Sequence, residues 1–134
     1  DSNFRQGMSV INVSNLLVER TIFSNTDGTP PMAGVDLEPD SHCMMLNNVT
    51  FRDCASTGNS GFGWILSPHM LNASSCPLSI LVDNLTVSGS TTPPPKDVAH
   101  PSWRPGMGIG ITGVNEAGTM LEDWGTGALR GSIC

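Results

Sequence analysis

The fold is decided by a six-residue stretch, Val13-Ser14-Asn15-Leu16-Leu17-Val18, with the pattern apolar-polar-Asn-apolar-x-apolar. Two further copies are Leu46-Asn47-Asn48-Val49-Thr50-Phe51 and Val82-Asp83-Asn84-Leu85-Thr86-Val87. Apolar residues two apart are typical of short strands with one inward face. Asn before such a pair tolerates the left-handed backbone of a sharp bend. The repeat therefore predicts stacked coils in which Asn15, Asn48 and Asn84 form a ladder.

A second pattern, Gly-apolar-x-apolar, follows each copy after a turn-rich spacer of variable length. It occupies residues 34–37, 61–64 and 108–111. In a solenoid each coil buries its inward residues against the neighbouring coils, so Val18, Phe51 and Val87 should stack inside.

Composition agrees with an all-β chain of one domain, residues 1–134. Gly (15) and Pro (10) are abundant, whereas charged residues make up only 13% of the chain. The net charge of −6 and the scattered basic residues indicate that nucleic acid is not a partner. No apolar run reaches the roughly 18 residues of a membrane span.

Two features together predict a secreted, extracellular protein. Four cysteines without a Cys-x-x-Cys pair suit disulfides. Four Asn-x-Ser/Thr sequons, at Asn12, Asn48, Asn72 and Asn84, can accept N-linked glycans. We expect glycans on Asn12 and Asn72. Asn48 and Asn84 coincide with the ladder and would carry glycans only if their side chains turned outward.

The cysteines at positions 43, 54, 76 and 134 allow three disulfide connectivities. Cys43 and Cys76 precede their ladder Asn residues by five and eight positions, one coil apart. This spacing favours a Cys43–Cys76 bridge and, by elimination, a Cys54–Cys134 bridge.

The motifs also resemble a known family. Residues 25–39, Asn-Thr-Asp-Gly-Thr-Pro-Pro-Met-Ala-Gly-Val-Asp-Leu-Glu-Pro, are similar to a stretch common in right-handed parallel β-helix proteins of the pectin-lyase-like superfamily. Residues 48–54 and 58–63 resemble a coil of the same proteins. The resemblance covers about residues 10–66 and implies a right-handed parallel β-helix of about four to five coils. It does not imply one chemistry, because the superfamily includes lyases, hydrolases and structural members.

An acidic strand is the main candidate for chemistry. Asp36, Glu38 and Asp40 alternate with apolar residues, so their carboxyls should share one face. Such a group could bind calcium, or Asp36 and Glu38 could act as the acid and base of a polysaccharide lyase or glycoside hydrolase. A solvated acidic strand is the simpler interpretation. We therefore predict no catalytic residue and keep the enzyme as the alternative.

Other candidate sites are weaker. Asp27-Gly28 is interpreted as a turn, because the partner motifs of a polygalacturonase do not occur. Arg20 and Arg52 could stack beside Glu19 and Asp53 as an exposed ion ladder rather than as a lyase base. His42, His69 and His100 lack metal-ligand spacing, and the adjacent His42 and Cys43 should point to opposite faces of a strand, so no metal site is predicted.

An irregular Pro-rich loop is expected at about residues 89–105, where Trp103 could stack on a sugar. The function predicted is a structural module of an extracellular matrix, wall or filament, associated with carbohydrate. Its expected partners are covalent glycans and either copies of itself or further coils, because a solenoid exposes unpaired backbone groups at its ends.

Overall fold

The structure is a computed structural model that describes residues 2–90, 108–111 and 128–133. These residues form ten strands and no helix. The strands are β1 (Gln6–Val10), β2 (Val13–Glu19), β3 (Ile22–Ser24), β4 (Ala33–Leu37), β5 (Leu46–Arg52), β6 (Ala55–Thr57), β7 (Trp64–Leu66), β8 (Ile80–Ser88), β9 (Ile109–Ile111) and β10 (Ala128–Ile133). No described segment forms a helix of the length and hydropathy needed to cross a membrane.

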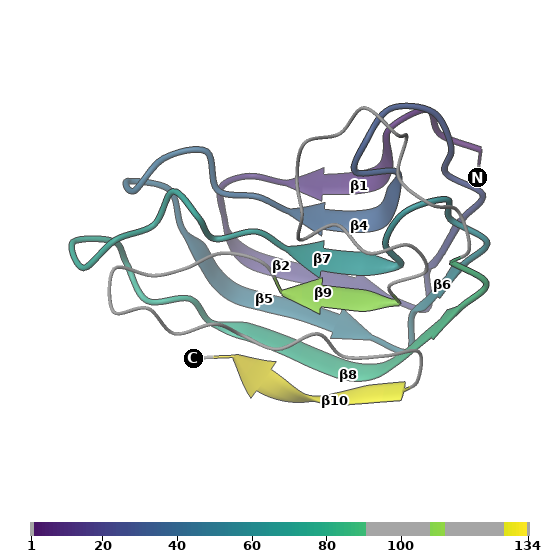
Figure 1. The fold of residues 1–134 in the computed structure, drawn as a ribbon. Coiled ribbons are helices and arrows are strands. Elements are labelled where there is room, and N and C mark those ends of the chain that lie inside the picture. Colours follow the sequence, from purple (N-terminus) through teal and green to yellow (C-terminus); the bar gives the residue numbers. More distant parts are fainter. Residues whose placement is uncertain (1, 91–107, 112–127, 134) are drawn as a thin grey trace.

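The strands belong to two sheets, between which the chain alternates (Figure 1). Sheet A has the parallel order β1-β4-β7-β9. Sheet B has the order β2-β5-β8-β6-β3, also parallel, with β10 added antiparallel to β8. β8 is long enough to pair twice: its first half pairs with β5 and its second half with β6.

The hydrophobic core lies between the sheets because each strand turns one side inward. Sheet A contributes Val35, Leu37 and Trp64, and sheet B contributes residues such as Phe51 and Val82, all with at most 1% of their surface exposed. Phe51 and Trp64 meet edge to face, with ring centroids 6.1 Å apart. Burial of these side chains is the main stabilising contribution of the fold.

Sharp bends in sheet B fall at residues with positive φ, arranged in rows across neighbouring strands. Asn15 (φ 65°) and Asn48 (φ 52°) form one row, and the Nδ2 of Asn48 donates to the Oδ1 of Asn15 at 2.8 Å. The predicted ladder is therefore confirmed for these two residues. Asn84 (φ 56°) lies instead beside Asp53 (φ 52°), to which its Nδ2 donates at 2.8 Å.

The third copy of the repeat is thus shifted in register. Val18 pairs with Phe51 as predicted, but Phe51 pairs with Val82, and Val87 pairs with Ser56. The predicted stacking of Val87 on Phe51 is wrong, and so is the place of Asn84 in the ladder. Asn and Asp both tolerate the left-handed conformation, so the letter Asn alone does not fix the register.

Sheet A contains a row of glycines that its close strand spacing requires. A Cβ on Gly7 would lie 2.6 Å from the carbonyl oxygen of Gly34, and one on Gly34 would lie 2.6 Å from that of Gly63. Gly63 has the same relation to Gly108, at 2.6 Å. Any larger residue at Gly34 or Gly63 would have to push a neighbouring strand away. The Gly-apolar-x-apolar unit predicted at residues 61–64 therefore begins at Gly63, not at Gly61.

The prediction of a right-handed parallel β-helix of about four to five coils is wrong. The described residues form two parallel sheets, and this part of the chain contains no solenoid or closed coil. The parallel order of sheet B also ends at β8, because its next partner is the antiparallel strand β10. A repeat of short apolar pairs is satisfied by strands that alternate between two sheets, so it did not require a coil. Most of the expected Pro-rich loop, with Trp103, lies outside the described residues.

Candidate functional site

Asp36 is the most unusual ionisable group of the described residues. It lies on β4 between the core residues Val35 and Leu37, so its side chain points to the opposite face of sheet A. Only 1% of its surface is exposed. The Nε2 of Gln6, on the neighbouring strand β1, donates to its Oδ2 at 3.2 Å.

The pKa of Asp36 is raised to about 7, and burial is the largest cause. The charge of Glu38, a side-chain hydrogen bond with Glu38 and the charge of Asp40 contribute to this rise, whereas the charge of Arg5 opposes it. At neutral pH Asp36 is therefore protonated in a large share of molecules and can donate a hydrogen bond to Glu38. A carboxylic acid in this state has the protonation that a general acid needs.

Access to this acid is the obstacle to catalysis. The three predicted carboxyls range from buried Asp36 through half-buried Glu38 to exposed Asp40, so they do not form one solvated acidic face. A polymer substrate would have to displace neighbouring groups before it touched Asp36. A protonated Asp36 hydrogen-bonded to Glu38 is also a poor calcium ligand. Within the described residues no three His, Cys, Asp or Glu side chains are grouped to hold a metal ion, and the calcium site stays a prediction.

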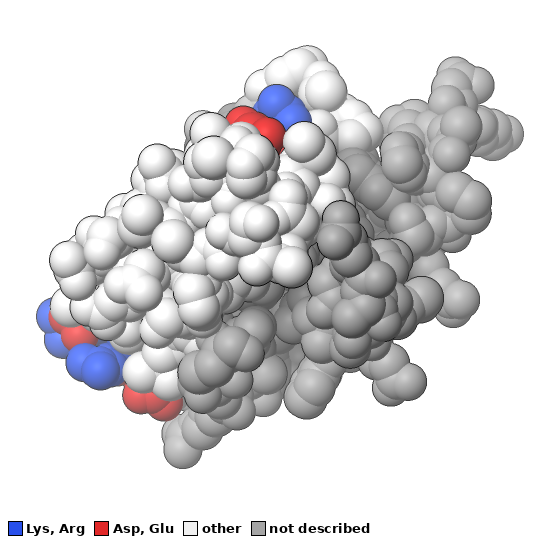
Figure 2. Space-filling view, turned by 90° about the vertical axis from the view of Figure 1, so that its left-hand side faces the viewer, with Lys and Arg blue, Asp and Glu red and all other residues white. Residues whose placement is uncertain are grey.

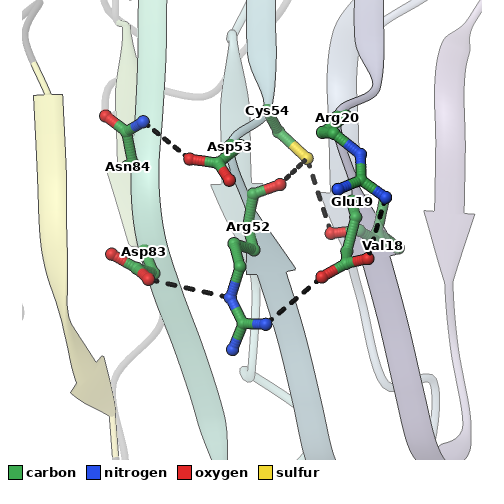
Figure 3. A network of polar contacts seen from close by, with 8 residues as sticks. All are labelled: Val18, Glu19, Arg20, Arg52, Asp53, Cys54, Asp83 and Asn84. Atoms are coloured by element: carbon green, nitrogen blue, oxygen red, sulfur yellow. Dashed lines mark hydrogen bonds and ion pairs between the residues drawn. The ribbon is translucent and has the colours of Figure 1, made fainter.

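The charged side chains of sheet B form a ladder on its outer surface (Figure 3). Arg52 on β5 lies between Glu19 on β2, at 3.2 Å, and Asp83 on β8, at 3.7 Å. Arg20 adds a contact of 3.4 Å to Glu19. The predicted ion ladder is confirmed for Glu19, Arg20 and Arg52, whereas Asp53 accepts a hydrogen bond from Asn84 instead.

Charge is sparse elsewhere on the face that carries the connections between the sheets. Figure 2 shows this face as mostly uncharged, with basic and acidic side chains gathered in small mixed groups. Because the acids and bases lie next to one another, they neutralise each other locally. The described part of this face therefore offers no extended field of one sign to steer a charged polymer.

The four sequon asparagines divide into two pairs. Asn12 is exposed, and its Oδ1 accepts a hydrogen bond from the backbone N–H of Met45 at 2.9 Å. The Oδ1 of half-buried Asn72 accepts one from the N–H of Ser74 at 2.8 Å. In both residues Nδ2, the atom that carries an N-linked glycan, has no hydrogen-bond partner among the described residues.

Asn48 and Asn84 are exposed too, so the expectation of inward amides at these positions is wrong. Their Nδ2 atoms are nevertheless donors, to Asn15 and to Asp53, both at 2.8 Å. A glycan on either Nδ2 would replace one of its two hydrogens and crowd the neighbouring strand. The structure therefore separates two free amide nitrogens from two that stabilise bends.

Cys43, Cys54 and Cys76 are free thiols in the structure, so the predicted Cys43–Cys76 bridge is not formed. Cys134, the predicted partner of Cys54, lies outside the described residues. Cys43 lies in a turn, not in a strand, and its Sγ is 3.2 Å from the Nε2 of His42. The expectation that the side chains of His42 and Cys43 point to opposite faces is therefore wrong.

Sequence reasoning missed a buried polar group behind the bends. The side chain of Asn59 accepts from the N–H of Thr26 at 3.0 Å and donates to Ser56 at 2.9 Å and to the carbonyl of Phe23 at 3.2 Å. Ser56 in turn donates to the carbonyl of Gly63 at 2.6 Å. These bonds join residues up to 36 positions apart, so only the position of Asn59 in a Gly/Ser turn hinted at them. Their role is structural.

Comparison of the chain with protein family models, with curated proteins and with solved structures gave no match. The resemblance to the pectin-lyase-like superfamily stays a prediction from the motifs of residues 10–66. Function has to be argued from the described residues themselves.

Proposed function

We propose that this protein is a secreted, N-glycosylated module with a structural role in an extracellular matrix, wall or filament, associated with carbohydrate through its own glycans. The observation that carries the proposal is the state of Asn12 and Asn72. Each has its Oδ1 held by a backbone N–H and its Nδ2 without a partner in the described part of the chain. This arrangement holds a glycan stem in one direction without breaking a contact between strands.

Two further features support a structural role. The outer charged side chains of sheet B are paired with one another, so these pairs would have to break before Arg52 could bind a charged ligand. Among the described residues, β1 and β2 are edge strands, paired on one side only. Open edges favour contact with further strands, including those of another copy. Assembly with copies of itself is part of this proposal.

Glycopeptide mapping of the protein secreted from eukaryotic cells tests the proposal. We expect glycan on Asn12 and on Asn72, removed by peptide N-glycosidase. Asn12→Gln and Asn72→Gln should each lose one glycan, whereas the matched variants Asn48→Gln and Asn84→Gln should keep the glycan mass of the parent. A protein retained in the cell without glycan, or one with glycan on Asn48 and none on Asn12, would contradict the proposal.

A polysaccharide lyase or glycoside hydrolase is the second candidate. It is favoured by the raised pKa of Asp36 beside Glu38, since a protonated acid next to a second carboxyl is the pair that glycoside hydrolysis uses. The burial of Asp36 counts against it. Assays on acidic and neutral polysaccharides, read as new reducing ends and as unsaturated products, should show no turnover above that of Asp36→Asn. Turnover that this variant abolishes would establish the enzyme instead.

A further inference from the structure

Strand β2 leaves part of its backbone open at the edge of sheet B. It pairs with β5 on one side only. The N–H of Arg20, directly after β2, donates to the carbonyl of Arg52 at 3.0 Å. The backbone groups of successive strand residues point alternately to the two sides, so those of Leu17 and Glu19 point away from β5. The carbonyl of Glu19 accepts from the Oγ1 of Thr21 at 2.9 Å, which leaves the N–H and C=O of Leu17 open among the described residues.

The side chain of Asn15 adds a second open group at the same edge. Its Oδ1 accepts from the Nδ2 of Asn48 on β5 at 2.8 Å, whereas its own Nδ2 has no partner among the described residues. The Nδ2 of Asn48 points toward β2, the next strand of the sheet. By the same geometry, the exposed Nδ2 of Asn15 is a hydrogen-bond donor on the side where the sheet has no further described strand.

The other side chains at this edge do not protect it against a further strand. Leu17 on β2 and Ile22 on β3, which is also an edge strand, are 57% and 67% exposed. β2 contains no proline or lysine, and its one charged residue is Glu19, at its end. Natural edge strands commonly carry such residues to prevent pairing. Sheet B already includes an antiparallel strand, because β10 pairs with β8.

We propose that two copies of this chain associate through their β2 strands, which pair antiparallel about a two-fold axis at Leu17. Leu17 of one copy then lies opposite Leu17 of the other, and their open N–H and C=O groups bond reciprocally. Asn15 lies opposite Glu19 of the other copy, where its free amide nitrogen can donate to the carboxylate. Glu19 therefore meets a donor rather than a like charge. This self-complementarity selects a second copy as the partner.

The proposal deepens the structural function proposed above, on which its biological role rests, by naming the surface and the partner of self-association. Association is measured on the purified full chain by its mass in solution, whereas the glycans are measured by glycopeptide mapping. A monomeric chain that carries both glycans would refute only the association. A dimer without glycans would refute only the glycosylated module.

Sedimentation over a series of protein concentrations is the main test. We expect a monomer–dimer equilibrium and expect Leu17→Lys to raise the dissociation constant at least tenfold, because two lysines would meet at the axis. Leu81→Lys is the matched control. Leu81 occupies the same outer row, through Thr50, but its strand β8 lies between β5 and β10. This control should dissociate as the parent does.

Asn15→Asp tests the donor without disturbing the bend. Aspartate tolerates the left-handed backbone and still accepts from Asn48, but it cannot donate and would face Glu19 of the other copy. We expect a severalfold weaker dimer, and the loss should be larger at low salt than at high salt.

Amide hydrogen exchange locates the contact. Exchange at Leu17 should slow as the protein concentration rises, because its N–H bonds only in the dimer. The amide of Arg20, which donates within the chain, should be protected at every concentration. A chain that stays monomeric, or grows beyond a dimer, would overturn the proposal, because an isologous contact closes on itself. Equal effects of Leu17→Lys and Leu81→Lys, or exchange at Leu17 that ignores concentration, would overturn it as well.

Discussion

Asp36 on sheet A and Asp83 on sheet B show how neighbouring strands set the state of a carboxyl. Each residue directly follows a core residue of a parallel strand, Val35 before Asp36 and Val82 before Asp83. Asp83 has 44% of its side chain exposed and lies 3.7 Å from Arg52 of β5. Asp36 is 1% exposed, and its neighbours are an amide, Gln6, and a second carboxyl, Glu38. Burial beside a second acid stabilises the protonated form of Asp36, whereas Asp83 is solvated and lies in an ion pair.

The largest effect on the free energy of unfolding should come from Asp36→Asn. Since its pKa is about 7 in the folded protein and near 3.9 in an unfolded chain, folding takes up a proton between these values. The free energy of unfolding contributed by Asp36 is therefore full below about pH 4 and is lost as pH rises to about 7. Asn keeps the shape and the hydrogen-bonding capacity but cannot ionise. We expect the variant to match the parent at pH 4 and to exceed it at pH 8 by a few kcal/mol.

Urea unfolding of both proteins at pH 4, 6 and 8 measures this difference, and the contributions of other groups cancel between them. Asp83→Asn is the matched control. Because its ion pair is exposed, its effect should stay below about 1 kcal/mol at each pH. If Asp36→Asn were less stable than the parent at pH 8, Asp36 would be an ionised and paired carboxylate, and the contrast between the two sheets would disappear.

Asn84→Ala, on sheet B, should have an intermediate effect on the free energy of unfolding. The change removes the 2.8 Å hydrogen bond to Asp53 and leaves a Cβ-bearing residue without a polar side chain at φ 56°. Loss of the bond and poorer tolerance of the left-handed conformation together should cost about 1–2 kcal/mol. Asn84→Gly loses the same bond but accepts this φ, so it should cost less. Equal losses in thermal or urea unfolding would show that the bend contributes nothing and that the hydrogen bond is the whole effect.

The strands themselves could be predicted from local sequence, but their register could not. Apolar alternation located most of β2, β5 and β8, and Asn15 with Asn48 gave a correct pair of bends. The third copy was placed wrongly because Asp53, which also has a positive φ, lies beside Asn84 where the repeat predicted Asn48. The prediction of a solenoid was wrong because the same apolar pairs can belong to strands of two sheets. The spacing of these pairs also did not indicate that β10 pairs antiparallel with β8.

The sequence identified candidate site residues, but it did not predict which side chains surround them. Asp36 was identified as a candidate, but its hydrogen-bond partner Gln6 lies 30 positions away and belongs to another strand. The contact between His42 and Cys43 was missed because strand alternation was assumed where the chain forms a turn. Long-range pairing decides both environments, and sequence spacing carries little information about it.

The smallest effect on the free energy of unfolding should come from Arg52→Met, which removes the central residue of the ion ladder on sheet B. Methionine retains much of the apolar stem of Arg52 but removes its contacts with Glu19 at 3.2 Å and Asp83 at 3.7 Å. The side chain of Arg52 is 45% exposed, so water and salt screen both pairs, and the loss should be below about 1 kcal/mol. Most of that loss should disappear in about 1 M NaCl, where screening is short-ranged. Arg20→Ala is the control: its side chain is 77% exposed with one contact, to Glu19 at 3.4 Å, and urea unfolding should detect almost no change. A loss of several kcal/mol for Arg52→Met that persists in salt would mean that the ladder is buried in solution, and sheet B would then handle its charges as sheet A does.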